Sequence, residues 1–338
     1  MSHTSLVVGG GAIGGVIAAR LTRAGQRVIV LEANEDVAAR LREPGISVDA
    51  LGEQWVVPLE VVTAASDLQT DIDFALIALK ARSIDQAVSA LVETDRVDSY
   101  VSLGNGLVQD VIADITGRDR LLVGTVSWGA TNLGAGHVAQ TTRAPIAIGE
   151  LDGSMTPRLR NLGEVLDDVC EVHLTNRIVG QVWSKLLLNS TFSGLGTVAG
   201  GTYAEVMERS SGRYLAHRLW TEGYLVSQAL GVDLDEVAGV DPADLVVMRP
   251  SDAPRADAAI DDLVSRIGAT LASMLQDLRQ GLPTEVGVIN GGVLREGTRL
   301  GVDVPVNAAV TELITGFQAG IDAPDPRHLD ALMEALAQ

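Results

Sequence analysis

The sequence predicts an α/β protein in which a doubly wound parallel sheet is followed by an all-helical region. Three observations lead to this fold class. An apolar run, a glycine cluster, a helical pattern and a second apolar run follow one another within Ser5–Leu31. Further strand candidates then alternate with helical patterns, and strand-like runs cease after about Leu174. Alternating strands and helices are typical of parallel sheets that carry helices on their faces.

The first half of the chain supplies the expected sheet. Ser5–Val8 and Val28–Leu31 are apolar enough for buried strands, and the helical pattern Ile13–Ala24 between them completes a βαβ unit. The further expected strands are Phe74–Leu79, Tyr100–Leu103 and Leu121–Val123, with Val138–Gln140 and Ile146–Ile148 as the last strands of the same sheet. Helices are expected between them at Ser83–Leu91 and Leu107–Ile115.

The second half shows helical patterns. The expected helices are Ile178–Leu188, Tyr214–Leu230, Ile260–Leu278, Glu285–Leu300 and Asn307–Ala319, with a short one after Pro326. Asp241–Pro254 carries three prolines and is interpreted as an irregular connection within the helical half. At roughly 100–200 residues per domain, a chain of 338 residues suggests two domains. We expect a dinucleotide-binding domain at 1–174 and a helical substrate and dimerisation domain at 175–338.

Composition excludes several classes of partner. The chain has 25 basic and 44 acidic residues, a formal net charge of −19, so nucleic acid would repel it and anionic membranes would not attract it. The single cysteine, Cys170, cannot form an intramolecular disulfide, which fits a reducing compartment. No apolar run is long enough for a membrane span, and no basic region precedes the first apolar stretch. We therefore expect a cytoplasmic protein. The five histidines show no metal-binding spacing, so we expect no metal.

A glycine-rich turn joins the first expected strand to the first expected helix. Gly9-Gly10-Gly11-Ala12-Ile13-Gly14 fits the pattern G-x-G-x-x-G. The first glycine of that pattern permits a tight turn, the second lets a pyrophosphate approach the backbone, and the third lets helix and strand pack closely. A turn that binds nothing is the alternative. The surrounding strand, helix and second strand favour a Rossmann-type dinucleotide site. We assign to it Gly9, Gly11, Ala12, Ile13 and Gly14.

Glu32 ends the second expected strand, 18 residues after Gly14. A carboxylate there accepts hydrogen bonds from the adenosine ribose 2′-hydroxyl and repels a 2′-phosphate. The sequence therefore favours NAD(H) over NADP(H). The alternative is a surface glutamate, with Arg40 and Arg42 close enough in sequence to bind a phosphate if the loop curls back.

Four short segments resemble those of the ketopantoate reductase (2-dehydropantoate 2-reductase) family and occur in the same order. They are Leu79-Lys80-Ala81, Gly104-Asn105-Gly106, Trp183-Ser184-Lys185-Leu186-Leu187-Leu188-Asn189, and Ser273-Met274-Leu275-Gln276-Asp277 followed by Thr284-Glu285. The resemblance runs from the first expected strand to about Phe317. It implies hydride transfer from a nicotinamide cofactor to 2-dehydropantoate, giving pantoate for pantothenate biosynthesis, and it also implies a homodimer.

Lys185 is the candidate general acid. Lys185 and Asn189 are four residues apart and share a helix face, which Ser193 continues if the helix extends that far. Lys185 stands among apolar residues in the sequence. If its ammonium points into a cleft, burial and a bound cofactor could tune its pKa so that it protonates the alkoxide formed by hydride transfer. The resemblance implies this role. The alternative is a lysine whose stem lies along apolar neighbours and whose head reaches water.

The resemblance implies four further site residues. Glu285 would orient Lys185 or the product hydroxyl, and it follows Pro283-Thr284 at the expected start of a helix, where the dipole favours a carboxylate. Ser273 would bind substrate. Lys80 and Asn105 follow the carboxyl ends of two expected strands, where cofactor and substrate bind in open α/β sheets. The ordinary alternatives are a first-turn glutamate, a small core residue of helix Ile260–Leu278, a charged strand end and a plain turn.

Three positions depart from the family. Many members that use NADP have arginine at the position of Glu32, and many that bind ketopantoate have asparagine at the positions of Ser193 and Thr270. The last two changes remove amides from the expected substrate pocket, which we assign to Asn105, Asn189, Ser193, Thr270 and Ser273. One alternative is thus an NAD-dependent 2-hydroxy acid dehydrogenase of the same family acting on another branched or aromatic 2-oxo acid. The other is a non-catalytic dinucleotide-sensing module.

Overall fold

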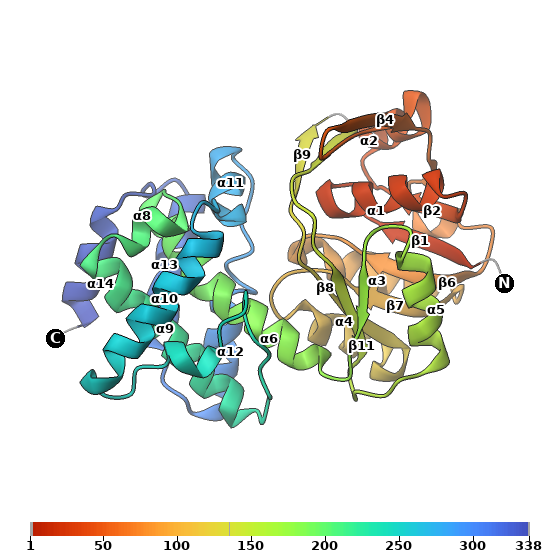
Figure 1. Ribbon diagram of the computed structural model, residues 1–338. Helices are drawn as coiled ribbons and strands as arrows, with labels where there is room; N and C mark the ends of the chain where they lie inside the picture. The colour runs from red at the N-terminus through yellow and green to blue at the C-terminus, as the bar shows by residue number, and fades with distance from the viewer. Residues whose placement is uncertain (1–2, 135, 337–338) are drawn as a thin grey trace. The chain divides into compact units, whose positions relative to one another are not determined.

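The computed structural model describes residues 3–134 and 136–336 (Figure 1). Met1 and Ser2, which belong to the segment where we expect no signal peptide, lie outside the described residues. The chain divides into two compact units. The first comprises the residues up to Gly104 together with Val108–Ile178, and the second comprises Asn105–Leu107 together with the residues from Val179 onwards. The domain limits 1–174 and 175–338 remain a sequence-based prediction.

The first unit is built on an eight-stranded sheet, β12-β11-β8-β7-β6-β1-β2-β5. The strands from β5 to β8 in this order are parallel, whereas β11 runs antiparallel to β8 and β12 runs parallel to β11. The bounds are β1 Thr4–Val8, β2 Arg27–Leu31, β5 Glu60–Val62, β6 Ile72–Ile77, β7 Val97–Ser102, β8 Leu121–Val126, β11 Ile146–Glu150 and β12 Val172–Leu174. Winding reverses between β1 and β6, which confirms the predicted doubly wound sheet.

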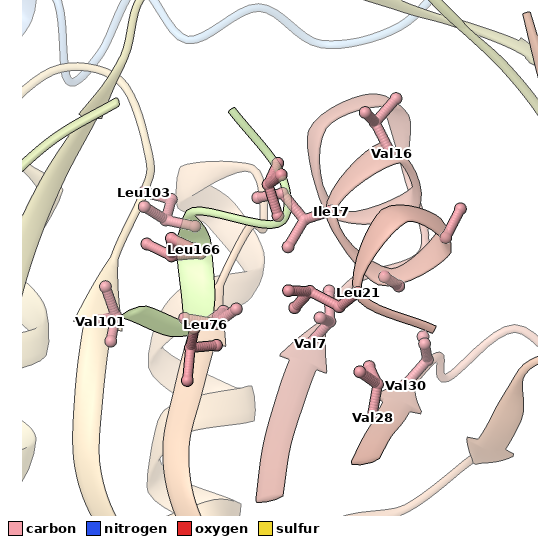
Figure 2. Close-up of a cluster of buried hydrophobic side chains, with 14 of the residues drawn as sticks. Val7, Val16, Ile17, Leu21, Val28, Val30, Leu76, Val101, Leu103 and Leu166 are labelled. Atoms are coloured by element: carbon pink, nitrogen blue, oxygen red, sulfur yellow. The ribbon is translucent and has the colours of Figure 1, made fainter. Parts of the chain in front are cut away.

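Helices cover this sheet. They are α1 Ala12–Arg23, α2 Glu35–Arg40, α3 Ile84–Glu93, α4 Val108–Thr116 and α5 Pro157–Leu166. The main core cluster contains Ile17 and Leu21 of α1 with Val7 of β1, and Leu166 of α5 with Leu76 of β6. Figure 2 shows these side chains over the strands. Leu and Ile fill the space because the chain is only 3% aromatic.

A second, four-stranded sheet corrects one sequence-based assignment. Val138–Gln140 belongs to β10 (His137–Gln140), which is not part of the main sheet but lies in the order β4-β3-β10-β9. The partners are β3 Ile46–Ala50, β4 Glu53–Val57 and β9 Ala130–Gly134. Ile46 and Val138 join the α1 core cluster, so α1 is buried from this side as well. That explains why nearly every residue from Gly14 to Leu21 is buried.

The second unit is helical. Its helices are α6 Ile178–Leu188, α7 Gly194–Ala199, α8 Tyr203–Met207, α9 Ser210–Ala229, α10 Ala253–Ile267, α11 Ser273–Arg279, α12 Asn290–Leu300, α13 Pro305–Gln318 and α14 Arg327–Leu336. A π-helical turn, Asn189–Ser193, connects α6 to α7. In its described residues, β-structure is limited to two isolated bridges, Thr202 with Leu271 and Val237 with Val240. No helix of the described chain is long and apolar enough to cross a membrane.

Two expected helices are interrupted. Ile260–Leu278 is broken because α10 ends at Ile267 and α11 begins only at Ser273. The residues between them turn away from the helix axis, and Leu271 bridges to Thr202 instead. The helix expected from Glu285 begins at Asn290, since Glu285–Ile289 forms a separate turn. Glu285 therefore does not occupy the first turn of a helix.

Gly14→Ala tests the packing of α1 on β1. A Cβ at Gly14 would lie 2.0 Å from the Gly9 carbonyl oxygen, a backbone atom that cannot rotate away. We expect the free energy of unfolding to fall by about 1–3 kcal/mol, as for other overpacked cores. Gly11→Ala is the control, because its Cβ would meet no atom within 4 Å and should change stability by less than about 1 kcal/mol. Equal denaturation midpoints for the two variants would contradict this account.

Candidate active site

In the glycine turn of the first unit, the fold requires glycine at Gly9 and Gly14 but not at Gly11. Gly9 has φ +100°, and a Cβ on Gly14 would collide with its carbonyl, so the chain's own packing demands both. Gly11 is the N-cap of α1, where no side chain caps the helix and where an added Cβ would meet open space. In the predicted site, a phosphate would accept from the N–H groups at the start of α1, which include those of Ala12 and Ile13.

Glu32 is held beside this turn by backbone donors. The N–H of Gly10 donates to Oε2 at 3.1 Å, and the N–H of Asn34 donates to Oε1 at 3.0 Å. The Arg42 guanidinium is engaged elsewhere, donating from Nε and Nη2 to the Val61 carbonyl at 3.2 and 3.1 Å. The charge next to the glycine turn is therefore a fixed carboxylate, and Arg42 is committed to the backbone. Arg40 lies exposed on α2.

Lys80 lies at the sheet edge where the winding reverses. It follows β6, and the N–H of Ala78 still donates to the Val8 carbonyl of β1 at 3.0 Å. Leu79 packs so closely on Gly9 that a Cβ there would lie 2.8 Å from the Leu79 Cδ2. Lys80 is exposed at this edge. The first unit thus places Lys80 after the carboxyl end of β6, directly after Leu79, which packs on Gly9.

Lys185 and Asn189 lie where α6 passes into the π-helical turn. Lys185 is within α6, and Asn189 is the first residue of the turn. The Lys185 side chain is only partly exposed. Desolvation by burial lowers its pKa from 10.5 to about 8, although the Glu285 carboxylate opposes that change. An amine with this pKa is still largely protonated at neutral pH and gives up its proton more readily than an ordinary lysine.

Glu285, whose charge acts on Lys185, is held by the loop Asn105–Leu107, which precedes α4. Asn105 donates from Nδ2 to Glu285 Oε2 at 3.1 Å. Gly106 has φ +70°, and its Cβ would lie 2.3 Å from the Val288 carbonyl oxygen, so the loop rests directly on the turn that carries Glu285. The same carbonyl accepts from the Leu107 N–H at 3.3 Å. The second unit therefore brings together Asn105, Glu285 and Lys185.

Ser193 is paired with a residue that sequence reasoning missed. Its Oγ lies 2.6 Å from the Tyr203 hydroxyl in a buried contact and donates to Asn189 Oδ1 at 3.4 Å. Burial raises the pKa of Tyr203, and the hydrogen bond to Ser193 lowers it by less. The Tyr203 N–H also donates to the Thr270 carbonyl at 3.2 Å. The Thr202-x-x-Glu205 capping box signals a helix start beside Tyr203, but no sequence signal pairs Tyr203 with Ser193.

Thr270 and Ser273 are placed differently from Asn189 and Ser193. Thr270 lies in the break between α10 and α11, and Ser273 begins α11. Both are exposed, so Ser273 is not a core residue of a continuous helix. Within the described residues, groups of at least three His, Cys, Asp or Glu side chains that could hold a metal are absent.

The distribution of lysine singles out two candidate residues, one in each unit. The chain has 25 basic residues, and all of them are arginines except Lys80 and Lys185. Arginine stays charged in proteins, whereas a lysine amine can lose its proton when it is desolvated. The chain thus uses lysine only at two positions singled out by the family resemblance.

Comparisons with known proteins identify a family. The family model described as "Ketopantoate reductase PanE/ApbA" matches residues 5–153, and that of its C-terminal part matches residues 177–318. The chain is 24% identical over 316 residues to the 2-dehydropantoate 2-reductase of Archaeoglobus fulgidus, covering 93% of this chain and 98% of the relative. It is 25% identical over 311 residues to the enzyme of the same name from Halobacterium salinarum, covering 91% and 97%.

Solved structures show the same fold. One is D-mandelate dehydrogenase with NADH and anilino(oxo)acetate, with a TM-score of 0.80 at 21% identity, covering 94% of this chain and 99% of that one. Another is a PanE/ApbA family ketopantoate reductase from Ralstonia eutropha, with a TM-score of 0.78 at 22% identity and the same two coverages.

Glu285→Gln tests the electrostatic pairing in this site. Removing the carboxylate charge should lower the pKa of Lys185 below about 8, because that charge favours the ammonium. The pH dependence of Lys185 acetylation by acetic anhydride, followed by mass spectrometry with Lys80 as internal reference, measures this shift. Glu312→Gln, an equal charge change at an exposed position of α13, is the control and should leave the midpoint unchanged. An unchanged midpoint in Glu285→Gln would exclude the pairing.

Proposed function

Because the chain belongs to the ketopantoate reductase PanE/ApbA family, we propose that it reduces a small 2-oxo acid with NADH, using Lys185 as the general acid. The observation that carries the proposal is the half-buried Lys185 amine beside Glu285, a carboxylate that accepts from the Asn105 amide at 3.1 Å; burial lowers the pKa of Lys185 to about 8. A non-catalytic dinucleotide sensor would not need a lysine tuned in this way. Perturbed lysines in such surroundings are characteristic of acid–base catalysis.

The proposed residues divide the work of the reaction. The nicotinamide, when bound, supplies the hydride that is added to the substrate C2. Lys185 donates its proton to the carbonyl oxygen as negative charge develops there. Glu285, oriented by the Asn105 amide at 3.1 Å, keeps the Lys185 ammonium charged and aligned. Asn189 lies one turn further along the same segment and binds an oxygen of the substrate. In this proposal the Lys80 ammonium binds the substrate or the cofactor at the sheet edge, and Ser273 binds the substrate.

Cofactor preference follows from Glu32. Its carboxylate is fixed by the N–H groups of Gly10 and Asn34 beside the glycine turn, where a ribose 2′-hydroxyl can donate to it. A 2′-phosphate at this position would face a carboxylate. The nearby Arg42 cannot compensate for that repulsion without leaving the Val61 carbonyl.

The first candidate substrate is 2-dehydropantoate. The supporting observation is the similarity to the curated 2-dehydropantoate 2-reductases over more than nine-tenths of the chain. Binding and protonation of a 2-oxo acid require amide donors and charged groups. In this proposal they are the amides of Asn105 and Asn189 and the charges of Lys185 and Glu285.

A second candidate is a 2-oxo acid with an apolar or aromatic side chain. The Ser193 hydroxyl already contacts Tyr203 Oη at 2.6 Å and Asn189 Oδ1 at 3.4 Å, so little of its hydrogen-bonding capacity remains for a substrate hydroxyl. The fold likeness to a D-mandelate dehydrogenase is compatible with such a substrate. This would make the chain an NAD-dependent 2-hydroxy acid dehydrogenase of the same family.

NADH oxidation with matched 2-oxo acids tests the function and separates the candidates. The pair 2-dehydropantoate and 3,3-dimethyl-2-oxobutanoate differs only by the 4-hydroxyl, and phenylglyoxylate corresponds to mandelate. A higher kcat/KM for the hydroxylated acid supports the first candidate, and the reverse order supports the second. In either case Lys185→Met should lower kcat by about 10²–10⁴-fold, and wild-type kcat should decline as pH rises through about 8.

The control for this variant is NADH binding, measured by fluorescence, which Lys185→Met should retain. Retained turnover in Lys185→Met would refute the assignment of the acid. Binding of NADH by the wild-type chain without turnover of any 2-oxo acid would favour the sensing module.

Glu32→Gln tests the cofactor proposal. Neutralising the carboxylate keeps its size but removes the repulsion of a 2′-phosphate, so the wild-type preference for NADH over NADPH should fall by roughly tenfold, or about 1.4 kcal/mol. The ratio of the two kcat/KM values measures the change. Glu35→Gln makes the same charge change on exposed α2 and should leave the ratio intact. A wild-type preference for NADPH would reverse the proposal.

A further inference from the structure

The second unit contains a fully buried amide outside the set of residues considered so far. Asn290 is the first residue of α12 and has no exposed surface. Its Nδ2 donates to the Ser190 carbonyl at 2.8 Å and to Asn307 Oδ1 at 3.1 Å. Both hydrogens of this amide are therefore used, each by a different structural element.

The partner of Asn290 on α13 is itself fixed. The buried Glu222 of α9 accepts from the N–H groups of Val306 and Asn307, both at 3.0 Å, and from Asn307 Nδ2 at 2.9 Å. Because the Asn307 NH₂ group is bound to a carboxylate, its Oδ1 must face the other way, where Asn290 donates to it. The orientation of Asn290 is thus set by a chain of buried hydrogen bonds that begins in α9.

The other partner, the Ser190 carbonyl, lies in the π-helical turn. In an α-helix this carbonyl would accept from the Gly194 N–H. Here the Gly194 N–H donates to the carbonyls of Asn189 and Thr191 instead. The Ser190 carbonyl accepts from the Asn290 amide in place of the Gly194 N–H. The Asn290 side chain can approach because Gly194 has no side chain: a Cβ on Gly194 would lie 3.2 Å from Asn290 Oδ1.

Asn290 thereby joins the two segments that carry the candidate polar groups. Ser190 directly follows Asn189. On the other side, the turn that begins at Glu285 ends at Asn290, with the Ile289 N–H donating to the Glu285 carbonyl at 3.1 Å. We propose that Asn290 is a positioning residue, which sets Asn189 and Glu285 at their places around Lys185. This inference rests on the proposed function only in that the reduction needs those places.

A purely structural role explains the arrangement less well. A buried amide in a helical core offers little net stability compared with well-packed apolar side chains, because its desolvation offsets the hydrogen bonds. The specific contribution of the Asn290 amide is to local geometry. A leucine at this position would leave the Ser190 carbonyl without a donor, and the π-helical turn could then return to α-helical form. π-helical turns of this kind are frequent at functional sites.

Asn290→Leu tests the proposal against a matched control. Val310→Ala removes buried methyl groups from α13 without touching a hydrogen bond, and it reports what a loss of stability alone does to activity. We expect kcat of Asn290→Leu to fall roughly ten- to a hundredfold, as for small misplacements of reacting groups. NADH binding should stay as in wild type. A kcat equal to that of Val310→Ala would overturn the proposal, even if Lys185→Met still abolished turnover and thereby upheld the proposed function.

Acetylation of Lys185 gives a second readout that needs no turnover. If Asn290 holds the Glu285 turn in place, its loss should move the midpoint for Lys185 acetylation to lower pH, while the Lys80 profile and the Val310→Ala profile stay unchanged. An unmoved Lys185 midpoint would show that Asn290 does not position Glu285. This result decides the inference even if the wild-type chain reduces none of the acids tested.

Discussion

The arrangement of the second unit depends on keeping one ammonium charged where water has largely been removed. Burial lowers the pKa of Lys185 to about 8, and a nearby anion opposes a further fall. Glu285 provides the anion, but it lies on a turn, which is intrinsically less rigid than a helix. Its position is secured from outside by the Asn105 amide and by a loop that rests on the Val288 carbonyl. The groups whose positions matter most for Lys185 thus lie on short connecting segments, and contacts with neighbouring segments fix these positions.

In the first unit, packing fixes helix α1 while its N-terminus stays without a side-chain cap. Helix α1 packs on the main sheet through Val7 and is covered by Ile46 and Val138 of the second sheet. Burial on these sides fixes the axis of α1, while its first turn stays uncapped by any side chain at Gly11. A rigid helix with an open positive end is what a pyrophosphate requires. The second sheet therefore helps to fix the helix whose N-terminus forms the proposed dinucleotide site.

Some of these structural features could be predicted from the sequence, and others could not. The βαβ unit, the glycine turn and α6 could be predicted because strong periodicity and local motifs specify them. The second sheet could not, since β3 alternates buried and half-buried residues over only five positions and pairs with the distant β10. The helix break before Ser273 and the turn at Glu285 likewise depend on tertiary partners. Tyr203 and Asn290 were missed because hydrogen bonds between elements leave no periodic signal.

The charge of the protein makes local groups decisive for binding. A net charge of −19 opposes both a dinucleotide and a 2-oxo acid, which are themselves anionic. At physiological ionic strength such repulsion is screened beyond about 8 Å, so groups within that distance of the ligand control its affinity. The start of α1 and the exposed Lys80 lie at one edge of the sheet, and Lys185 lies in the helical unit. An acidic surface is therefore compatible with the proposed anionic ligands as long as these positive groups remain in place, and the Glu285 carboxylate favours the charged form of Lys185.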